Sequence, residues 1–240
     1  MKNWIVLSLA LAAVSCSAQW GKGIKGNGNV VSIERSVGDY DAIAVSGSFD
    51  VDLVEGNEGE LVISGEQNLL DYIVTEVQGE KLVIRVKKGI SIRPSLHKGS
   101  IKVKVPVERI DALSLSGSGD IVGHTTLKTS RFKTSMSGSG DITLDVTTDA
   151  LVASMSGSGD MNLSGNTHDF EATISGSGDI RAYDLNADNV EATISGSADI
   201  KVTVNEKLKA RVSGSGDISY RGNPKKIDTK TSGSGDVSKG

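Results

Sequence analysis

The chain has 240 residues, of which 37% are hydrophobic, and a formal net charge of −4 without a basic patch. This length can bury a sizeable core, and the charge offers no basic surface of the kind that nucleic-acid-binding proteins use. The single cysteine excludes an intramolecular disulfide, so the core and the backbone hydrogen bonds must hold the fold.

Residues 1–18 read as a signal peptide. Lys2 supplies the positive end, residues 4–14 form an apolar run, and small residues follow. The apolar run is too short to span a membrane. The segment predicts that the protein is exported to the cell envelope or the extracellular space.

The end of this segment allows two interpretations. Residues 13–16, Ala-Val-Ser-Cys, resemble a lipoprotein box, in which Cys16 would be acylated and become the first residue. Ordinary cleavage after Ala18 is the alternative. The protein is then either lipid-anchored or secreted, and a lipid anchor is the one membrane attachment that the sequence predicts.

Residues 19–30 are rich in glycine and lysine and predict a flexible leader. A single domain is expected over residues 31–240, with irregular coils over 31–110 and regular coils over 111–240. In the irregular part, apolar alternation recurs at equal intervals around Leu61, Leu82 and Val103, which predicts that these coils keep a constant length. Residues 42–51 read as an early copy of the later repeat, with Phe49 at a glycine position, where it would fill a wider interior or cap the open end.

The regular part repeats the motif Ser-Gly-Ser-Gly-Asp-Ile, with small variations, seven times. The motif aspartates are Asp120, Asp141, Asp160, Asp179, Asp199, Asp217 and Asp236. A shared motif that recurs with a nearly constant period, here close to ~20 positions, indicates a repeat architecture.

Strict alternation around each motif predicts which side chains face inward. Stepping by two through Phe132, Thr134 and Met136 leads to the two motif glycines and leaves the serines and the aspartate on the outer face. A single repeat cannot bury its apolar side, but stacked repeats share one core. The sequence therefore predicts an all-β fold, a right-handed parallel β-helix (β-solenoid) with coils of about 18–21 residues. Since Ala198 once replaces the second motif glycine, that position is expected to require a small residue; the reason for the first glycine is left open.

The outward motif residues form a candidate repeated surface. They are Ser137, Ser139, Asp141, Ser156, Ser158, Asp160, Ser175, Ser177 and Asp179. The favoured interpretation of the aspartates is that they accept hydrogen bonds from the local backbone at a bend. Calcium binding by the aspartate column is the alternative, and no other cofactor is expected.

Catalysis on a β-helix would require singular residues that break the repeat, such as paired carboxylates for glycoside cleavage. The candidates are His124, Arg131, His168, Asp169 and Arg181, which are scattered and share no motif. The sequence therefore predicts no catalytic residues. A lyase or hydrolase acting on polysaccharides is kept as the alternative, to be recognised by convergence of these residues in one groove.

Three features together carry a family resemblance: residues 42–51, the short motifs Asn-Leu-Leu-Asp (68–71) and Val-Pro-Val-Glu (105–108), and the repeated array. With the leader, they resemble the auto-transporter adhesin head domain (GIN domain) family of bacterial envelope proteins. The resemblance implies a right-handed β-helix, an adhesive role and no established catalytic residues. The expected function is that of a non-enzymatic, secreted or envelope-anchored adhesin or structural scaffold, with a glycan or a protein as its surface ligand and no nucleic-acid partner.

Overall fold

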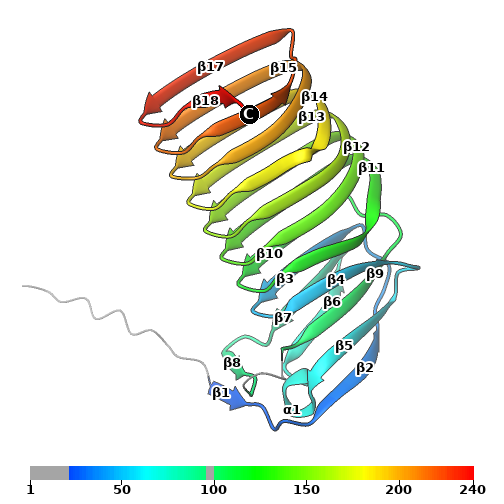
Figure 1. The fold of residues 1–240 in the computed structure, drawn as a ribbon. Coiled ribbons are helices and arrows are strands. Elements are labelled where there is room, and N and C mark those ends of the chain that lie inside the picture. Colours follow the sequence, from blue (N-terminus) through cyan, green and yellow to red (C-terminus); the bar gives the residue numbers. More distant parts are fainter. Residues whose placement is uncertain (1–21, 96–99) are drawn as a thin grey trace, which may run out of the picture.

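A computed structural model describes residues 22–95 and 100–240. Its strands wind into an elongated stack of coils that rises from an irregular base to the C-terminal end (Figure 1). The elements of the base are β1 (Lys22–Lys25), β2 (Val30–Ser36), β3 (Ala42–Gly47), β4 (Asp50–Glu55), β5 (Glu60–Glu66), α1 (Gln67–Leu70), β6 (Ile73–Gln78), β7 (Lys81–Val86), β8 (Ile90–Arg93) and β9 (Lys102–Val107). The stack continues with β10 (Ala112–Gly117), β11 (Ile121–Gly138), β12 (Ile142–Gly157), β13 (Met161–Gly176), β14 (Ile180–Gly196), β15 (Ile200–Gly214), β16 (Ile218–Gly222), β17 (Lys226–Gly233) and β18 (Val237–Lys239).

The regular part is a parallel β-solenoid in which each coil pairs with the next. Equivalent residues of successive repeats lie directly over one another, as Ser137, Ser156 and Ser175 do. A long bent strand provides most of each coil, and the Ser-Gly-Ser-Gly-Asp motif provides the bend between two such strands. The predicted all-β solenoid is confirmed.

The base departs from the predicted succession of coils. Strand β10 pairs with β3 in the register that the sequence alignment predicted, with Ala112 against Ala42 and Gly117 against Gly47. However, β3 also pairs with β7, and β4 pairs with β9. The chain therefore leaves the stack after β4 and forms β5 to β9, of which β7 pairs below β3 and β9 pairs below β4. It returns to the stack at β10, which pairs above β3.

Three strand pairs in the base are antiparallel, namely β2 with β5, β5 with β9, and β6 with β7. Leu61 pairs with Arg35, while Leu82 pairs with Ile43. The prediction that these leucines mark successive coils of equal length is wrong, because alternation identifies a strand but not its direction or its partner.

The segment that was expected to be a flexible leader contains strand β1, which pairs in parallel with β8. Beyond β1, the amide of Gly26 donates to the carbonyl of Arg93 at 2.9 Å, and Asn68 binds both Lys25 and Asn27. The prediction of flexibility therefore does not hold for residues 22–28. The predicted signal peptide and Cys16 lie outside the described residues.

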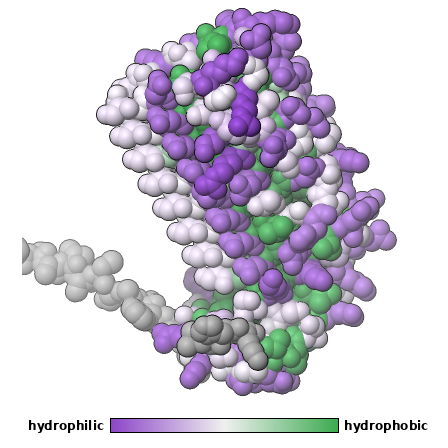
Figure 2. Space-filling model, viewed as in Figure 1, coloured by the Kyte–Doolittle hydropathy of each residue, from purple (hydrophilic) through white to green (hydrophobic). Residues whose placement is uncertain are grey.

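One continuous core runs through the stack. In β11 to β15, every residue that was predicted to face inward before the motif is buried, and Phe49 is 1% exposed. Phe49 fills the interior between the base and the first regular coil, with its ring against Gly47, so it does not cap an open end. The face of the molecule seen in Figure 2 is mostly hydrophilic, as expected for strands that alternate between core and solvent.

Candidate functional site

The motif bend brings neighbouring coils into close backbone contact. The first glycine of each motif has a φ between 125° and 157°, a conformation that disfavours other residues. A Cβ built on Gly157 would lie 2.0 Å from the carbonyl oxygen of Gly138 in the coil below. At this position both the backbone conformation and the lack of space require glycine.

The second motif glycine requires smallness alone. Gly159 has no such positive φ, yet a Cβ there would lie 1.8 Å from the carbonyl oxygen of Gly140. Ala198 holds the equivalent place in one coil and is fully buried. The sequence-based interpretation of this position is confirmed.

The motif aspartates form a ladder along the solenoid. Oδ1 of each aspartate from Asp50 to Asp217 accepts the backbone N–H of the motif aspartate in the next coil, at 2.8–3.3 Å. The prediction that these carboxylates accept hydrogen bonds from the local backbone at the bend is wrong, because the amide belongs to the neighbouring coil. The carboxylates therefore continue the interstrand ladder where the strands are interrupted.

Arg181 binds the second carboxylate oxygen, Oδ2, of two aspartates in this ladder. Its guanidinium donates to Oδ2 of Asp160 at 2.7 Å and to Oδ2 of Asp179 at 2.9 Å. The bond to Asp160 is the main cause that raises the pKa of Arg181 above its ordinary value. Within residues 22–95 and 100–240, no three His, Cys, Asp or Glu side chains converge as metal ligands would.

The candidate serines behave differently from the aspartates. Ser137, Ser139, Ser156, Ser158, Ser175 and Ser177 are all exposed. None of these hydroxyls forms a hydrogen bond with another described residue. They line the edge at which the long strands end, where Figure 2 shows a regular pale row.

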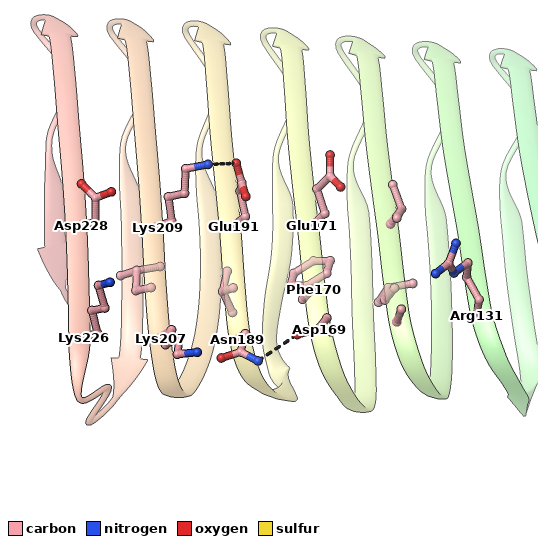
Figure 3. Close-up of a pocket in the computed structure, with 15 residues that line it drawn as sticks. Arg131, Asp169, Phe170, Glu171, Asn189, Glu191, Lys207, Lys209, Lys226 and Asp228 are labelled. Atoms are coloured by element: carbon pink, nitrogen blue, oxygen red, sulfur yellow. Dashed lines mark hydrogen bonds and ion pairs between the residues drawn. The ribbon is translucent and has the colours of Figure 1, made fainter.

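A second surface, which the sequence analysis did not identify, is a groove of about 570 Å³ across strands β11–β15 and β17 (Figure 3). The residues along its centre are the inward residues Leu151, Phe170, Val190 and Leu208. One wall carries Arg131, Ala150, Asp169, Asn189, Lys207 and Lys226, and the other carries Val152, Glu171, Glu191, Lys209 and Asp228. These wall residues stand six and four positions before the first serine of each motif, which is the one sequence signal that could have located the groove.

Several of the charged side chains in the groove have partners within the protein. Lys209 pairs with Glu191 at 2.5 Å, and Asn189 donates to Asp169 at 2.8 Å. Arg211 pairs with Asp228 at 2.6 Å, and this hydrogen bond is the main cause that lowers the pKa of Asp228.

Two lysines at the C-terminal end of the groove differ from these pairs. Lys207 and Lys226 lie directly against each other in neighbouring coils. Both are exposed, and neither forms an ion pair with another described residue. Among the described residues, this end of the groove therefore carries two lysines without an ion-pair partner.

The off-repeat residues that were considered for catalysis do not converge. His124 binds Asp52 at 2.9 Å, and His168 binds Asp188 at 2.9 Å in a different groove, where this bond is the main cause that raises the pKa of His168. Arg181 lies on the aspartate ladder, so only Arg131 and Asp169 share the groove of Figure 3.

Comparison with known families decides the affiliation. A family described as "Putative auto-transporter adhesin, head GIN domain" matches residues 39–224. The chain belongs to this family. The match covers the described strands from β3 to β16, and therefore includes the aspartate ladder up to Asp217 and most of the groove. No protein with a curated description matches the chain.

Solved structures share the fold of this GIN domain. A putative adhesin from Bacteroides fragilis is 24% identical, with a TM-score of 0.85, over 90% of this chain and 100% of its own. A putative lipid binding protein from Parabacteroides distasonis is 30% identical, with a TM-score of 0.77, over 91% and 100% of the two chains. A putative adhesin from Parabacteroides merdae is 23% identical, with a TM-score of 0.72, over 91% and 99%.

Among the described residues of this GIN domain, no helix is long and apolar enough to cross a membrane. The centroid of the Tyr183 ring lies 3.9 Å from Cζ of Arg221, so the guanidinium covers one face of this ring. The binding chemistry available on the regular coils is thus that of the serine row and the charged groove.

Proposed function

We propose that the chain is an exported, non-enzymatic binding protein of the bacterial envelope, and that its ligand is an extended molecule with acidic groups that lies in the groove. The observation that carries this proposal is one groove that crosses six stacked strands and ends at the free Lys207–Lys226 pair. At about 4.8 Å per strand, six strands extend over roughly 24 Å. This length suits a segment of a linear polymer or a lipid.

The family and its structural relatives support a binding role without chemistry. The description of the family names an adhesin, and the relative that is 30% identical is described as a putative lipid binding protein. An acidic glycan and an anionic lipid share the negatively charged group that the two lysines would bind. Because the off-repeat residues are distributed over separate places, the enzymatic alternative has no assembled site to support it.

The test reverses the charge at the end of the groove. The variant Lys207→Glu/Lys226→Glu is compared with Lys102→Glu/Lys104→Glu, a matched change at exposed lysines of β9. The probes are polygalacturonate as an acidic glycan and vesicles of phosphatidylglycerol as an anionic lipid surface, with phosphatidylcholine vesicles as the neutral reference. We expect salt-sensitive binding of one acidic probe, at least about tenfold weaker in the groove variant and unchanged in the control.

Equal binding by both variants would contradict the groove as the ligand site. Release of new reducing or unsaturated ends from polygalacturonate would contradict the non-enzymatic assignment. A further variant, Asp160→Asn/Asp179→Asn, tests whether the serine and aspartate columns form the ligand surface. Unchanged binding by that variant would exclude these columns.

Calcium at the aspartate ladder stays a prediction, and a thermal melt with calcium and with chelator tests it. A ligand that binds only the folded state raises the melting temperature. We expect no calcium-dependent rise, because each Oδ1 from Asp50 to Asp217 already binds a backbone amide. A large rise would make the ladder a metal site.

The mode of attachment to the envelope is part of the same proposal. We propose export through the leader, with either acylation of Cys16 or cleavage after Ala18. Labelling cells with a radioactive fatty acid separates the two. Label that disappears in Cys16→Ser shows a lipid anchor, and an unlabelled mature chain beginning at residue 19 shows secretion.

A further inference from the structure

The last coil leaves one long strand edge open. Among the described strands, β17 pairs with β15 alone, and all eight of its residues are exposed. Ile227, which continues the inward column of Leu208, is 47% exposed and is one of two large hydrophobic residues exposed in the described part of the chain. The edge therefore presents unpaired backbone groups beside an uncovered apolar side chain.

This edge carries Lys226 and Lys230 but lacks the other features that keep strand edges apart. Besides lysines, proteins commonly protect an edge with inward-pointing charges, prolines, bulges or very short strands. The inward residues of β17 are Ile227, Thr229 and Thr231, all uncharged, and its sequence contains no proline. Its pairing with β15 runs along the whole strand without a register shift.

At the base, the edge of β6 is protected. Among the described strands this sheet has two edge strands at the base, since β6 pairs with β7 alone and β2 pairs with β5 alone. The guanidinium of Arg35 donates to the carbonyl of Ile73 in β6 and to the carbonyl of Leu70 at 2.7 Å, just before β6. A side chain thus occupies backbone acceptors at the base, whereas the described residues place no side chain across the outer edge of β17.

We propose that β17 pairs with β17 of a second copy, antiparallel and about a two-fold axis at Thr229. In this register Asp228 lies opposite Lys230 of the other copy, and the symmetry generates the ion pair twice. Ile227 lies opposite Thr231, and Thr229 lies opposite its own copy. Opposite charges and Thr–Thr pairs directly across antiparallel strands are stabilising.

The charge order of β17 selects this register over its neighbours. In the paired strands, inward residues must lie opposite inward residues. The two-fold axis must therefore pass through a residue, because an axis between two residues would place inward residues opposite outward ones. An axis at Asp228 would place Asp228 opposite itself and Lys226 opposite Lys230. An axis at Lys230 would place Lys230 opposite itself. The register about Thr229 pairs the seven positions from Lys226 to Ser232, as many as the register about Lys230 and two more than the register about Asp228.

A two-fold pair is closed, whereas stacking the top of one copy on the base of another would continue into filaments. The self-complementary charges favour the closed pair, and the side chain of Arg35 stands against the open one. We therefore expect a dimer joined at the ends of the two solenoids.

The first test is a disulfide across the axis in the full chain carrying Cys16→Ser. Directly opposed residues of an antiparallel pair have Cα atoms about 4.5–5.5 Å apart, which is within the disulfide range of about 4.4–6.8 Å. We expect Thr229→Cys to become a disulfide-linked dimer under mild oxidation. The control Thr126→Cys, an exposed threonine on β11, should stay monomeric. Equal dimer yields from the two variants would overturn the proposal.

The second test exchanges the charges and measures the dimer dissociation constant by sedimentation. Asp228→Lys and Lys230→Asp should each weaken the dimer at least about tenfold, and the double exchange should restore it. Because Asp228 also binds Arg211, Thr229→Lys provides a variant that leaves this ion pair intact and opposes two lysines at the axis. A monomeric parent chain, filaments, or a dimer that all four variants leave unchanged would each contradict the register.

Discussion

At the scale of single residues, Thr134 is the one described buried side chain whose polar atom has no hydrogen-bond partner. It is fully buried in a column where the following coils carry Ala153 and Ala172. A buried hydroxyl without a partner costs about 1–3 kcal/mol. We expect Thr134→Val, which keeps the shape and removes the hydroxyl, to raise the free energy of unfolding by about 1 kcal/mol or more, as measured by urea denaturation.

The matched control for this change is Thr134→Ser. Serine keeps the hydroxyl and loses a methyl group, so it should lower the free energy of unfolding. If the valine and serine variants were destabilised alike, Oγ1 of Thr134 would have a partner in solution, and the interpretation of the site would be wrong.

The two motif glycines should respond differently to alanine. Gly157 has a φ of 151° and lies against the carbonyl of Gly138. We expect Gly157→Ala to lower the free energy of unfolding by about 1–3 kcal/mol from backbone strain, with the steric overlap in addition. Gly159→Ala should cost less, because Ala198 shows that one coil accommodates a methyl group there. Thermal melts of the two variants compare these costs, and a larger loss in Gly159→Ala would contradict the argument.

At the scale of elements, Glu66 joins β1 and the segment after β8 to the base. It is fully buried, and its carboxylate accepts the amide of Ser95 at 2.7 Å, the hydroxyl of Ser95 at 2.6 Å and the amide of Gly28. The hydrogen bonds from Ser95 are the main cause that lowers the pKa of Glu66. A lowered pKa means that the ionised form stabilises the folded state above the ordinary glutamate value of about 4.3, and that this contribution is lost as the pH falls from there through the lowered value.

We therefore expect Glu66→Gln to destabilise the base at neutral pH and to remove this part of the acid sensitivity. Glutamine retains one acceptor oxygen but introduces an amide that faces donors. Hydrogen exchange should show faster exchange at Gly28 and Ser95, while the amides of β12 to β14 stay protected. The exposed Glu60→Gln on the same strand is the control. Unchanged exchange at Gly28 would mean that Glu66 does not hold this segment.

The strands that the sequence predicted well are those whose signal is repeated. Period-two alternation identified the inward residues of β11–β15. The base was predicted less well. Alternation in β5 and β9 is the same for parallel and antiparallel partners, so the sequence could not show that β5 runs against both β2 and β9.

At the scale of the whole molecule, the site was harder to predict than the fold. Outward Asp141 and Asp160 follow from parity, but the hydrogen bond between them exists only because stacking places their coils in register. The groove was missed for a related reason. Charged residues four and six places before each motif are visible in the sequence, whereas the concave path of the strand that turns them into two walls depends on the packing of the coils.

The regular stack also predicts that whole coils can be removed. Stability in a solenoid is approximately a sum over repeats and their neighbour contacts. Deleting residues 161–179 joins Asp160 to Ile180, and preserves both the motif and the register, because Met161 and Ile180 are equivalent. At roughly 0.05–0.15 kcal/mol per residue, we expect a folded protein that has lost about 1–3 kcal/mol of unfolding free energy.

The control deletes residues 162–179, which places Met161 directly before Ile180. This deletion reverses the inward and outward alternation of the residues that follow, and so exchanges core and surface side chains. Circular dichroism and urea denaturation should show a cooperative native fold for the first deletion and its loss for the second; similar behaviour of the two would mean that the coils are not held together by the register of their inward columns.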